Sequence, residues 1–170
     1  MSNSEYLKQL NDFEAHYDYD VGYLRELLEH SPEGFAKFNA FMPLARHREQ
    51  LSLEEFWIAK LASMQVEDCG ACLQLNIRMA LEEGVDKALV AAAIHGGKQL
   101  PANLKAIYQF SRAIAANEAV DEQQQLAIEQ QLDKGQRLEL GLAIASTKIF
   151  PTLKRTLGEA TSCRLMDIAV

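Results

Sequence analysis

The sequence contains one pair of cysteines whose spacing suits redox chemistry, Cys69-Gly70-Ala71-Cys72. The pair opens residues 72–83, an apolar-periodic segment typical of a helix, and residues three apart on a helix share a face. A disulfide needs Cα atoms about 4.4–6.8 Å apart, so the two thiols can bond and separate with little backbone movement. Cys69 would lie at the helix N-terminus, where unpaired N–H groups and the helix dipole stabilise a thiolate. The spacing therefore predicts a redox dithiol.

Two other roles for the cysteine pair stay open at this level. Free cysteine is among the most buried residue types, so both residues could be small core side chains. They could also form half of a zinc site, but zinc needs four ligands and only His95 and Cys163 could join, at no recognised spacing. We therefore expect no metal and no bound cofactor. No strand pattern surrounds Cys69, which disfavours a thioredoxin-like fold.

The elements that must position the cysteines all have helical patterns. Ser52 and Glu55 form a capping box, the signature of a helix start. The predicted helices are residues 19–30, 33–42, 53–66, 69–83, 87–94, 101–116, 121–132 and 136–149. No linker long enough to separate domains interrupts them. The sequence predicts a single-domain, all-α helical bundle over residues 1–170.

Glycines and prolines mark where these helices should stop. Gly84 follows the cysteine-bearing helix in the position usual for a C-terminal glycine. Because proline cannot donate a backbone hydrogen bond, Pro43 is expected to end one helix and Pro151 to interrupt another. Gly135 is expected to separate the last two helices.

Charge and composition narrow the class of partner. The chain has 170 residues, enough for one domain with a sizeable core, and its net charge is -7. Nucleic acids and anionic membranes both select clustered Lys and Arg, so neither is expected as a partner. No segment approaches the ~20 apolar residues of a membrane span, and the first residues lack the basic and apolar regions of a secretory signal. We expect a cytoplasmic protein.

Two segments are unusually apolar. Residues 88–94 contain no polar side chain, and residues 138–145 offer only Glu139 to water. A helix that is apolar on every side is normally buried. In a domain of this size, part of such a surface is expected to face another subunit, so we expect a homo-oligomer.

The order of these features over residues 35–158 resembles the carboxymuconolactone decarboxylase and alkylhydroperoxidase D superfamily. The matching stretches are Leu51-Ser52-Leu53-Glu54-Glu55, a helix, Asp68-Cys69-Gly70-Ala71-Cys72, a second helix, Gly84-Val85-Asp86, and an Ala-rich helix. The resemblance implies a small, all-helical, oligomeric protein. Its peroxidase branch reduces hydroperoxides or passes electrons through the CxxC pair, which an external dithiol restores.

The resemblance also assigns roles to individual residues. Cys72 is similar to the reactive cysteine of the peroxidase branch and Cys69 to its resolving cysteine. That branch has a Glu twelve residues before the first cysteine and a His four residues after the second; these positions hold Trp57 and Asn76 here. An asparagine can form hydrogen bonds but cannot take a proton near pH 7. The expected function is an antioxidant thiol-disulfide oxidoreductase acting on a hydroperoxide or another small molecule.

Two alternatives to that function follow from the same residues. The absence of Glu and His at the two relay positions favours a non-catalytic or repurposed member of the fold. The decarboxylase branch acts on lactone acids without a CxxC, so a decarboxylase-like enzyme would make little use of the cysteine pair.

Four residues besides the cysteines are candidates for a supporting role. Asn76 shares a helix face with Cys72, so contact is expected, although the amide could be merely structural. Glu67 could supply the acid/base function, or belong with Asp68 to a capped, solvated turn. Trp57 lies on the apolar stripe of its helix and is expected in the core or a pocket wall. His95 ends the Ala-rich helix, where it would interact with the helix C-terminus or act as a base.

Overall fold

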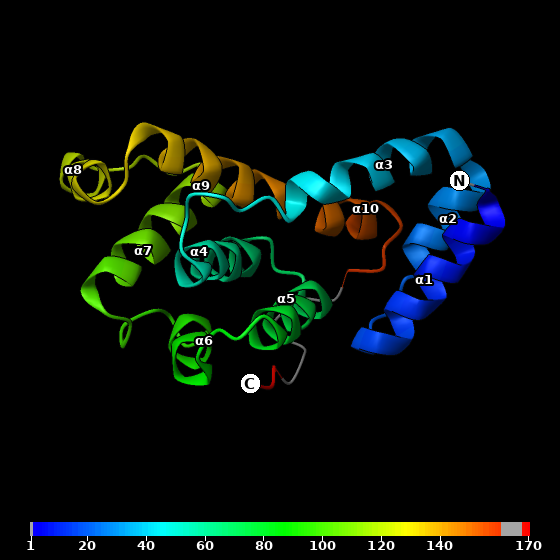
Figure 1. The fold of residues 1–170 in the computed structure, drawn as a ribbon, viewed down its shortest axis with the longest axis horizontal. Coiled ribbons are helices and arrows are strands. Elements are labelled where there is room, and N and C mark those ends of the chain that lie inside the picture. Colours follow the sequence, from blue (N-terminus) through cyan, green and yellow to red (C-terminus); the bar gives the residue numbers. More distant parts are fainter. Residues whose placement is uncertain (1, 161–167) are drawn as a thin grey trace.

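The helices of the protein cover most of the chain, and the predicted all-α class is confirmed. A computed structural model describes residues 2–160 and 168–170, and no strand occurs among them. The elements are α1 (Asn3–Tyr17), α2 (Gly22–His30), α3 (Pro32–Ala45), α4 (Leu53–Val66), α5 (Gly70–Glu82), α6 (Lys87–Ile94), α7 (Ala102–Ala116), α8 (Glu122–Gln131), α9 (Lys134–Ser146) and α10 (Ile149–Thr156). They form a single compact domain (Figure 1).

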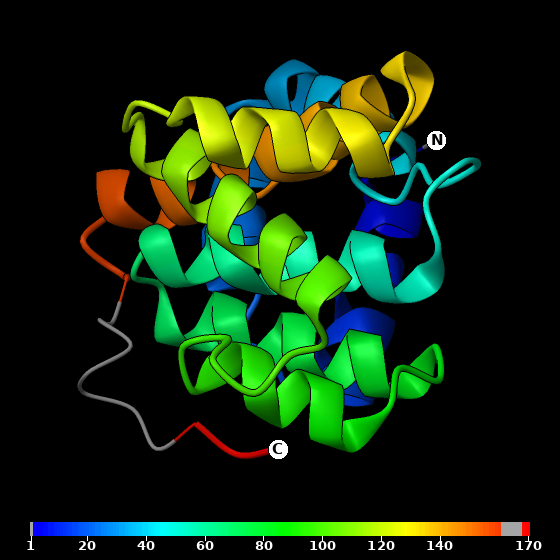
Figure 2. The same ribbon diagram turned by 90° about the vertical axis from the view of Figure 1, so that its left-hand side faces the viewer.

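Helix α4 lies in the middle of this domain, as Figures 1 and 2 show. It packs against α5, α6, α7 and α9. The sequence predicts that α4 has a single apolar stripe. In the structure the helix is buried on all sides, because every residue from Phe56 to Met64 is buried. The polar members of this run are satisfied internally: Ser63 Oγ donates to the Ala59 carbonyl (2.8 Å) and Lys60 Nζ to the Ala45 carbonyl (2.7 Å).

The core divides into two hydrophobic clusters. The α4 cluster consists of Leu51, Phe56, Trp57, Ile58, Ala59, Leu61, Ala62, Met64, Cys69, Cys72, Leu73, Ile77, Ala80, Val85, Val90, Ala92, Ala93, Leu100, Leu104, Ile107, Tyr108, Ala115, Ile128, Leu132, Leu140, Ala143 and Ile144. The aromatic cluster consists of Tyr6, Leu10, Tyr19, Val21, Tyr23, Leu24, Leu28 and Phe35. The aromatic cluster is formed by α1–α3 and by the segment between α1 and α2, which carries Tyr19 and Val21; these helices lie together on one side of the molecule (Figure 1).

Helix starts follow the signals in the sequence. At α4, the Ser52 hydroxyl accepts from the Glu55 amide (3.1 Å) and the Glu55 carboxylate from the Ser52 amide (2.9 Å), so the predicted capping box is confirmed. Helix α5 ends as expected before Gly84, whose φ of 97° is in the region that favours glycine.

Several predicted helix boundaries are wrong. The helix expected over residues 19–30 begins only at Gly22. Pro43 lies inside α3, where it forfeits only its own N–H bond shortly before the helix ends at Ala45. Gly135 lies in the first turn of α9, because Asp133 and Gln136 form a capping box that starts the helix earlier. Pro151 lies in the first turn of α10, where backbone N–H groups have no partner inside the helix. Neither α10 nor α1 was expected from the sequence pattern.

The apolar segment 138–145 also differs from its prediction. Glu139 was expected to face water but is 3 % exposed, whereas Leu138 is 65 % and Leu142 39 % exposed. The carboxylate accepts hydrogen bonds from the amides of Glu49, Gln50 and Leu51, which precede α4. Although burial by itself raises the pKa of Glu139, these hydrogen bonds lower it below its usual value.

Residues 88–94 form most of α6, and only part of this apolar helix is covered. Val90, Ala92 and Ala93 are buried, while Ala88 in the first turn is exposed. None of the helices in the described part of the chain combines the length and the apolar character needed to cross a bilayer.

Candidate redox site

The two cysteines stand at the start of α5 and are joined by a disulfide. Cys69 is the N-cap residue and Cys72 lies in the first turn, with an S–S distance of 2.09 Å and a Cα–Cα distance of 5.3 Å. The expected juxtaposition of the pair is therefore confirmed. Asp68, expected in a capped turn with Glu67, precedes the N-cap and has a φ of 49°, so the chain turns there between α4 and α5.

Both cysteines are buried, but they face different surroundings. Cys69 is 0 % and Cys72 1 % exposed. Cys72 lines a cavity of about 320 Å³, whereas Cys69 is not among the residues that form its wall. Ligand pockets are typically about 300–1,000 Å³, so the cavity is large enough for a small organic molecule.

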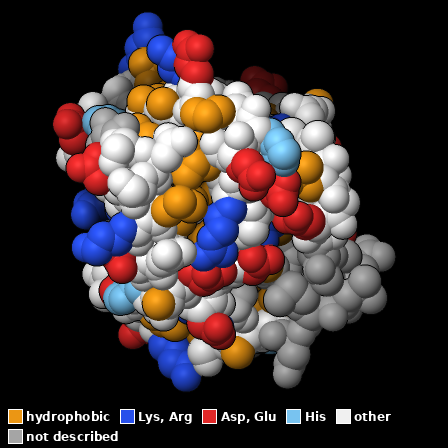
Figure 3. All heavy atoms as spheres, turned by 90° about the vertical axis from the view of Figure 1, so that its right-hand side faces the viewer, with side chains coloured by type: hydrophobic (Ala, Val, Ile, Leu, Met, Phe, Trp, Pro, Cys, Tyr) orange, Lys and Arg blue, Asp and Glu red, His pale blue; other side chains and the backbone are white. Residues whose placement is uncertain are grey.

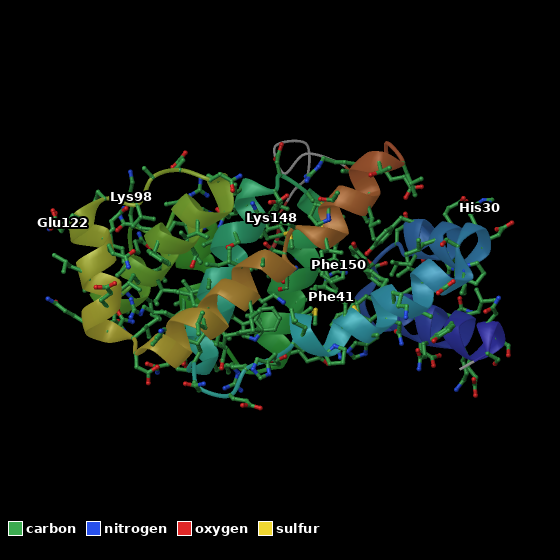
Figure 4. The ribbon with its side chains drawn as sticks, turned by 90° about the horizontal axis from the view of Figure 1, so that it is seen from above. His30, Phe41, Lys98, Glu122, Lys148 and Phe150 are labelled. Carbon is green, nitrogen blue, oxygen red and sulfur yellow. A yellow bond between two sulfur atoms is a disulfide. The ribbon has the colours of Figure 1, made fainter. Side chains whose placement is uncertain are left out.

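The wall of the cavity is mainly aromatic and aliphatic. It is formed by Tyr6, Gln9, Leu10, Phe13, Tyr19, Tyr23, Leu24, Phe35, Phe38, Asn39, Met42, Ala45, Arg46, Met64, Cys72, Leu75, Asn76, Met79 and Phe150. Figure 4 shows Phe150 of α10 next to Phe41 of α3, with ring centroids 6.2 Å apart. On the face that carries α1–α3, apolar side chains are exposed between charged ones (Figure 3). Among the described residues of the wall there is neither a histidine nor a carboxylate.

A tyrosine hydroxyl contacts the sulfur on the cavity side. Tyr19 Oη lies 3.8 Å from Cys72 Sγ and 3.5 Å from Tyr23 Oη, and Tyr19 is 4 % exposed. The Tyr19 hydroxyl is the donor toward Tyr23 Oη, and because a disulfide sulfur carries no hydrogen it is also the only group that can donate in the contact with Cys72, so its one hydrogen is shared between the two contacts. Burial raises the pKa of Tyr19 to about 12, and the nearby hydroxyl of Tyr23 offsets part of that effect.

A buried cation lies over the same tyrosine. Lys154 of α10 is 3 % exposed, and its Nζ is 4.6 Å from the ring centroid of Tyr19 and 4.9 Å from that of Tyr23. The ammonium also donates to the Asp20 carbonyl at 3.4 Å. Burial lowers the pKa of Lys154, and the negative charge of Asp20 acts in the opposite direction. An ammonium at this distance from a ring face is attracted by its negative charge density.

Of the candidates proposed from the sequence, Asn76 lies beside the cysteines. It lines the cavity together with Cys72, and its Nδ2 donates to the Cys72 carbonyl at 2.8 Å.

Trp57 is 1 % exposed and is absent from the cavity wall. Its Nε1 donates to Glu83 Oε2 at 2.9 Å. Trp57 is thus a core residue, in agreement with the first of its two expected positions.

The remaining candidates lie outside the cavity wall. Glu67 is engaged by Arg155, whose Nη2 is 2.9 Å from the carboxylate and whose Nη1 donates to the Glu67 carbonyl. His95 is exposed, and its Nδ1 lies 2.7 Å from the Ala91 carbonyl near the end of α6, the helix-terminus role anticipated for it. Cys163 lies outside the described residues.

The sequence pattern did not single out Tyr19 or Lys154. Tyr19 precedes Cys72 by 53 residues, and Lys154 belongs to a helix that the pattern did not predict. The local signal is limited to the presence of two tyrosines, Tyr19 and Tyr23, because Tyr19 precedes α2 and helical spacing does not align their rings.

No family model matches the sequence, and no curated protein and no solved structure matches it.

Proposed function

We propose that the protein is a dithiol oxidoreductase that reduces hydroperoxides, with Cys72 as the attacking thiol and Cys69 as the resolving thiol. The observation that carries this proposal is the asymmetry of the pair: Cys72 borders the cavity, while Cys69 lies behind it. A peroxide inside the cavity would therefore meet one sulfur first. The resemblance to the alkylhydroperoxidase D group assigns the two roles in the same order.

The position of Cys72 also suits an attacking thiolate. It lies in the first turn of α5, where the backbone N–H groups and the helix dipole favour negative charge. The mainly apolar wall around it would hold the organic part of a hydroperoxide and limit access of water.

The reaction would proceed in three balanced steps. The Cys72 thiolate attacks the terminal peroxide oxygen, the O–O bond breaks, and the departing alkoxide takes up a proton and leaves as an alcohol, with Cys72 as a sulfenic acid. The Cys69 thiol then displaces water from that sulfenic acid, which forms the disulfide seen in the structure. An external dithiol attacks Cys72, releases Cys69, and closes into its own disulfide as both protein thiols return.

Trapping the sulfenic acid tests this assignment. In Cys69→Ser, treatment of the reduced protein with cumene hydroperoxide should leave a sulfenic acid on Cys72, which a cyclic 1,3-diketone labels. Cys72→Ser should give no label at position 69, and Cys163→Ser should form the Cys69–Cys72 disulfide at the wild-type rate. Labelling of Cys69 in place of Cys72 would reverse the roles, and unreactive thiols in excess peroxide would refute the function.

A second candidate function is a non-catalytic binding protein for a small apolar molecule. The observation that favours it is the absence of histidine and carboxylate from the described cavity wall, since proton transfer usually depends on such groups. In this case the disulfide would be structural. Retention of a bound fatty acid by a Cys69→Ala/Cys72→Ala variant, combined with unreactive wild-type thiols, would support this function over the first.

A further inference from the structure

Cleavage of a peroxide bond by a thiolate creates a demand for a proton. As sulfur bonds to one oxygen, the other oxygen leaves with an electron pair as alkoxide or hydroxide, both strong bases. Sites of this kind use a positioned acid to protonate the leaving group, typically for a gain of about 10²–10⁴ in rate. Among the described residues of the cavity wall, the ionisable groups other than Cys72 are three tyrosines and Arg46.

Tyr19 is the one of these that contacts the reacting sulfur. Its hydroxyl lies 3.8 Å from Cys72 Sγ, and both side chains line the cavity. When one oxygen of the peroxide bonds to this sulfur, the other oxygen of the peroxide would lie close to the same hydroxyl. The hydroxyl of Tyr23 is one step further away, 3.5 Å beyond that of Tyr19.

We infer that Tyr19 is the catalytic acid of this site and donates its phenolic proton to the oxygen that leaves when Cys72 attacks a hydroperoxide. This inference rests on the proposed function. The S–O bond forms as the O–O bond breaks; Cys72 is oxidised to the sulfenic acid, the peroxide is reduced to the alcohol, and Tyr19 becomes a phenolate. The phenolate regains a proton from water that reaches the cavity.

The surroundings of Tyr19 keep its hydroxyl protonated before the transfer and stabilise the phenolate after it. Burial raises the pKa of Tyr19 to about 12, so the hydroxyl carries its proton at neutral pH. Hydroxide is the stronger base, since water has a pKa of about 15.7, and the transfer to the leaving oxygen is therefore downhill. The Lys154 ammonium, 4.6 Å from the ring centroid, stabilises the phenolate while it exists.

The experiment compares two oxidants whose leaving groups differ in how much they need a proton. Reduced Cys163→Ser protein and the same protein carrying Tyr19→Phe are mixed with tert-butyl hydroperoxide or with peroxyacetic acid, and the remaining thiols are counted in timed samples. An alkoxide leaves from the first oxidant, whereas a weakly basic carboxylate leaves from the second. Tyr23→Phe is the matched control, because it removes the neighbouring hydroxyl and leaves the one at Cys72.

Tyr19→Phe should lower the rate with tert-butyl hydroperoxide by about 10²–10⁴ and leave the rate with peroxyacetic acid close to that of the parent. Tyr23→Phe should have a much smaller effect with either oxidant. Equal losses with both oxidants, or equal losses in the two variants, would overturn the role of Tyr19. Failure of the parent protein to react with either oxidant would instead overturn the proposed function, and the inference with it.

A measurement on the parent protein alone covers the case in which Tyr19→Phe does not fold. With an internal acid, the rate should change little across hydroperoxides whose leaving groups become steadily more basic. A steep fall across that series would show that the leaving group departs without a proton, which contradicts the inference.

Discussion

The two hydrophobic clusters of this domain are built differently. The α4 cluster is largely aliphatic and surrounds a helix that is buried on all sides. Half of the aromatic cluster is Tyr or Phe, and a cavity of about 320 Å³ lies along it. Aliphatic side chains and alanines fill space around α4, whereas large rings on α1–α3 leave a gap between them.

The cysteine pair lies where these two clusters meet. Both cysteines belong to the α4 cluster, yet Cys72 borders the cavity beside the aromatic cluster. The well-packed region thus fixes the position of the disulfide, and the less densely packed region gives access to it. The two regions should therefore respond differently to substitution and to pH.

The two clusters should differ most in how much free energy of unfolding is lost when a leucine is shortened to alanine. Leu61→Ala, at a site that is 0 % exposed in the α4 cluster, should lower the free energy of unfolding by about 2–5 kcal/mol. Leu75→Ala is the matched change beside the aromatic cluster; it should cost about 1 kcal/mol, because Leu75 is half-buried and already borders empty space. Urea unfolding of both variants measures the difference. Equal losses would mean that the two regions are equally well packed.

High pH should affect the two regions in opposite directions. Burial, assisted by the positive charge of Arg46, lowers the pKa of Lys60 in α4 from 10.5 to about 8. Between those pH values the unfolded chain binds the extra proton, so stability should rise by about 2–3 kcal/mol from pH 8 to 10. Above pH 10 stability should fall again. Burial raises the pKa values of Tyr19 and Tyr23, so the folded state holds protons that the unfolded chain has lost.

Urea midpoints of the oxidised protein between pH 7 and 11 would trace this profile. Lys60→Met should remove most of the rise between pH 8 and 10, leave the smaller contribution of Lys154, whose pKa burial also lowers, and keep the fall above pH 10. A rise of undiminished size in Lys60→Met would assign it to another group.

A smaller effect is expected from single hydrogen bonds in the two regions. Asn76→Ala removes the bond to the Cys72 carbonyl, and Ser146→Ala removes a bond of similar length, 2.7 Å, from a buried hydroxyl of α9 to the Ala143 carbonyl. Each should cost about 1 kcal/mol. Because Asn76 lines the cavity, only Asn76→Ala should also change the rate of disulfide formation in peroxide. An equal change of rate in Ser146→Ala would contradict a local role for Asn76.

The smallest change in monomer stability is expected at the surface. We propose that the exposed Leu138 and Leu142, one turn apart on α9, belong to a contact between copies of the chain. Light scattering should then give a mass well above 19.0 kDa. Leu138→Lys should lower that mass while changing the unfolding free energy of the chain by less than about 0.5 kcal/mol.

Leu7→Lys, which alters a 43 % exposed leucine of α1, serves as the control and should leave the mass unchanged. A wild-type mass of one chain would show that the exposed leucines of α9 have no partner copy.

Local chemistry determined much of what the sequence revealed. A capping box acts over three residues, so Ser52 and Glu55 located the start of α4 without knowledge of the fold. The CxxC spacing likewise predicted that Cys69 and Cys72 would be close enough to bond, because an N-cap residue and the residue three positions later both lie at the first turn of the helix. Gly84 marked the end of α5 through its own backbone preference.

Tertiary packing decided the rest. Whether Glu139 faces water depends on backbone amides 88 to 90 residues away, and no pattern within residues 138–145 contains that information. Trp57 and Asn76 looked equivalent as relay positions, but only Asn76 reaches the cavity. The contact between Tyr19 and Cys72 joins residues 53 positions apart, so it exists only once α5 packs beside the chain that leads into α2. Sequence spacing fixes neighbours within a helix turn, whereas contacts between helices are set by how their side chains fill the space between them.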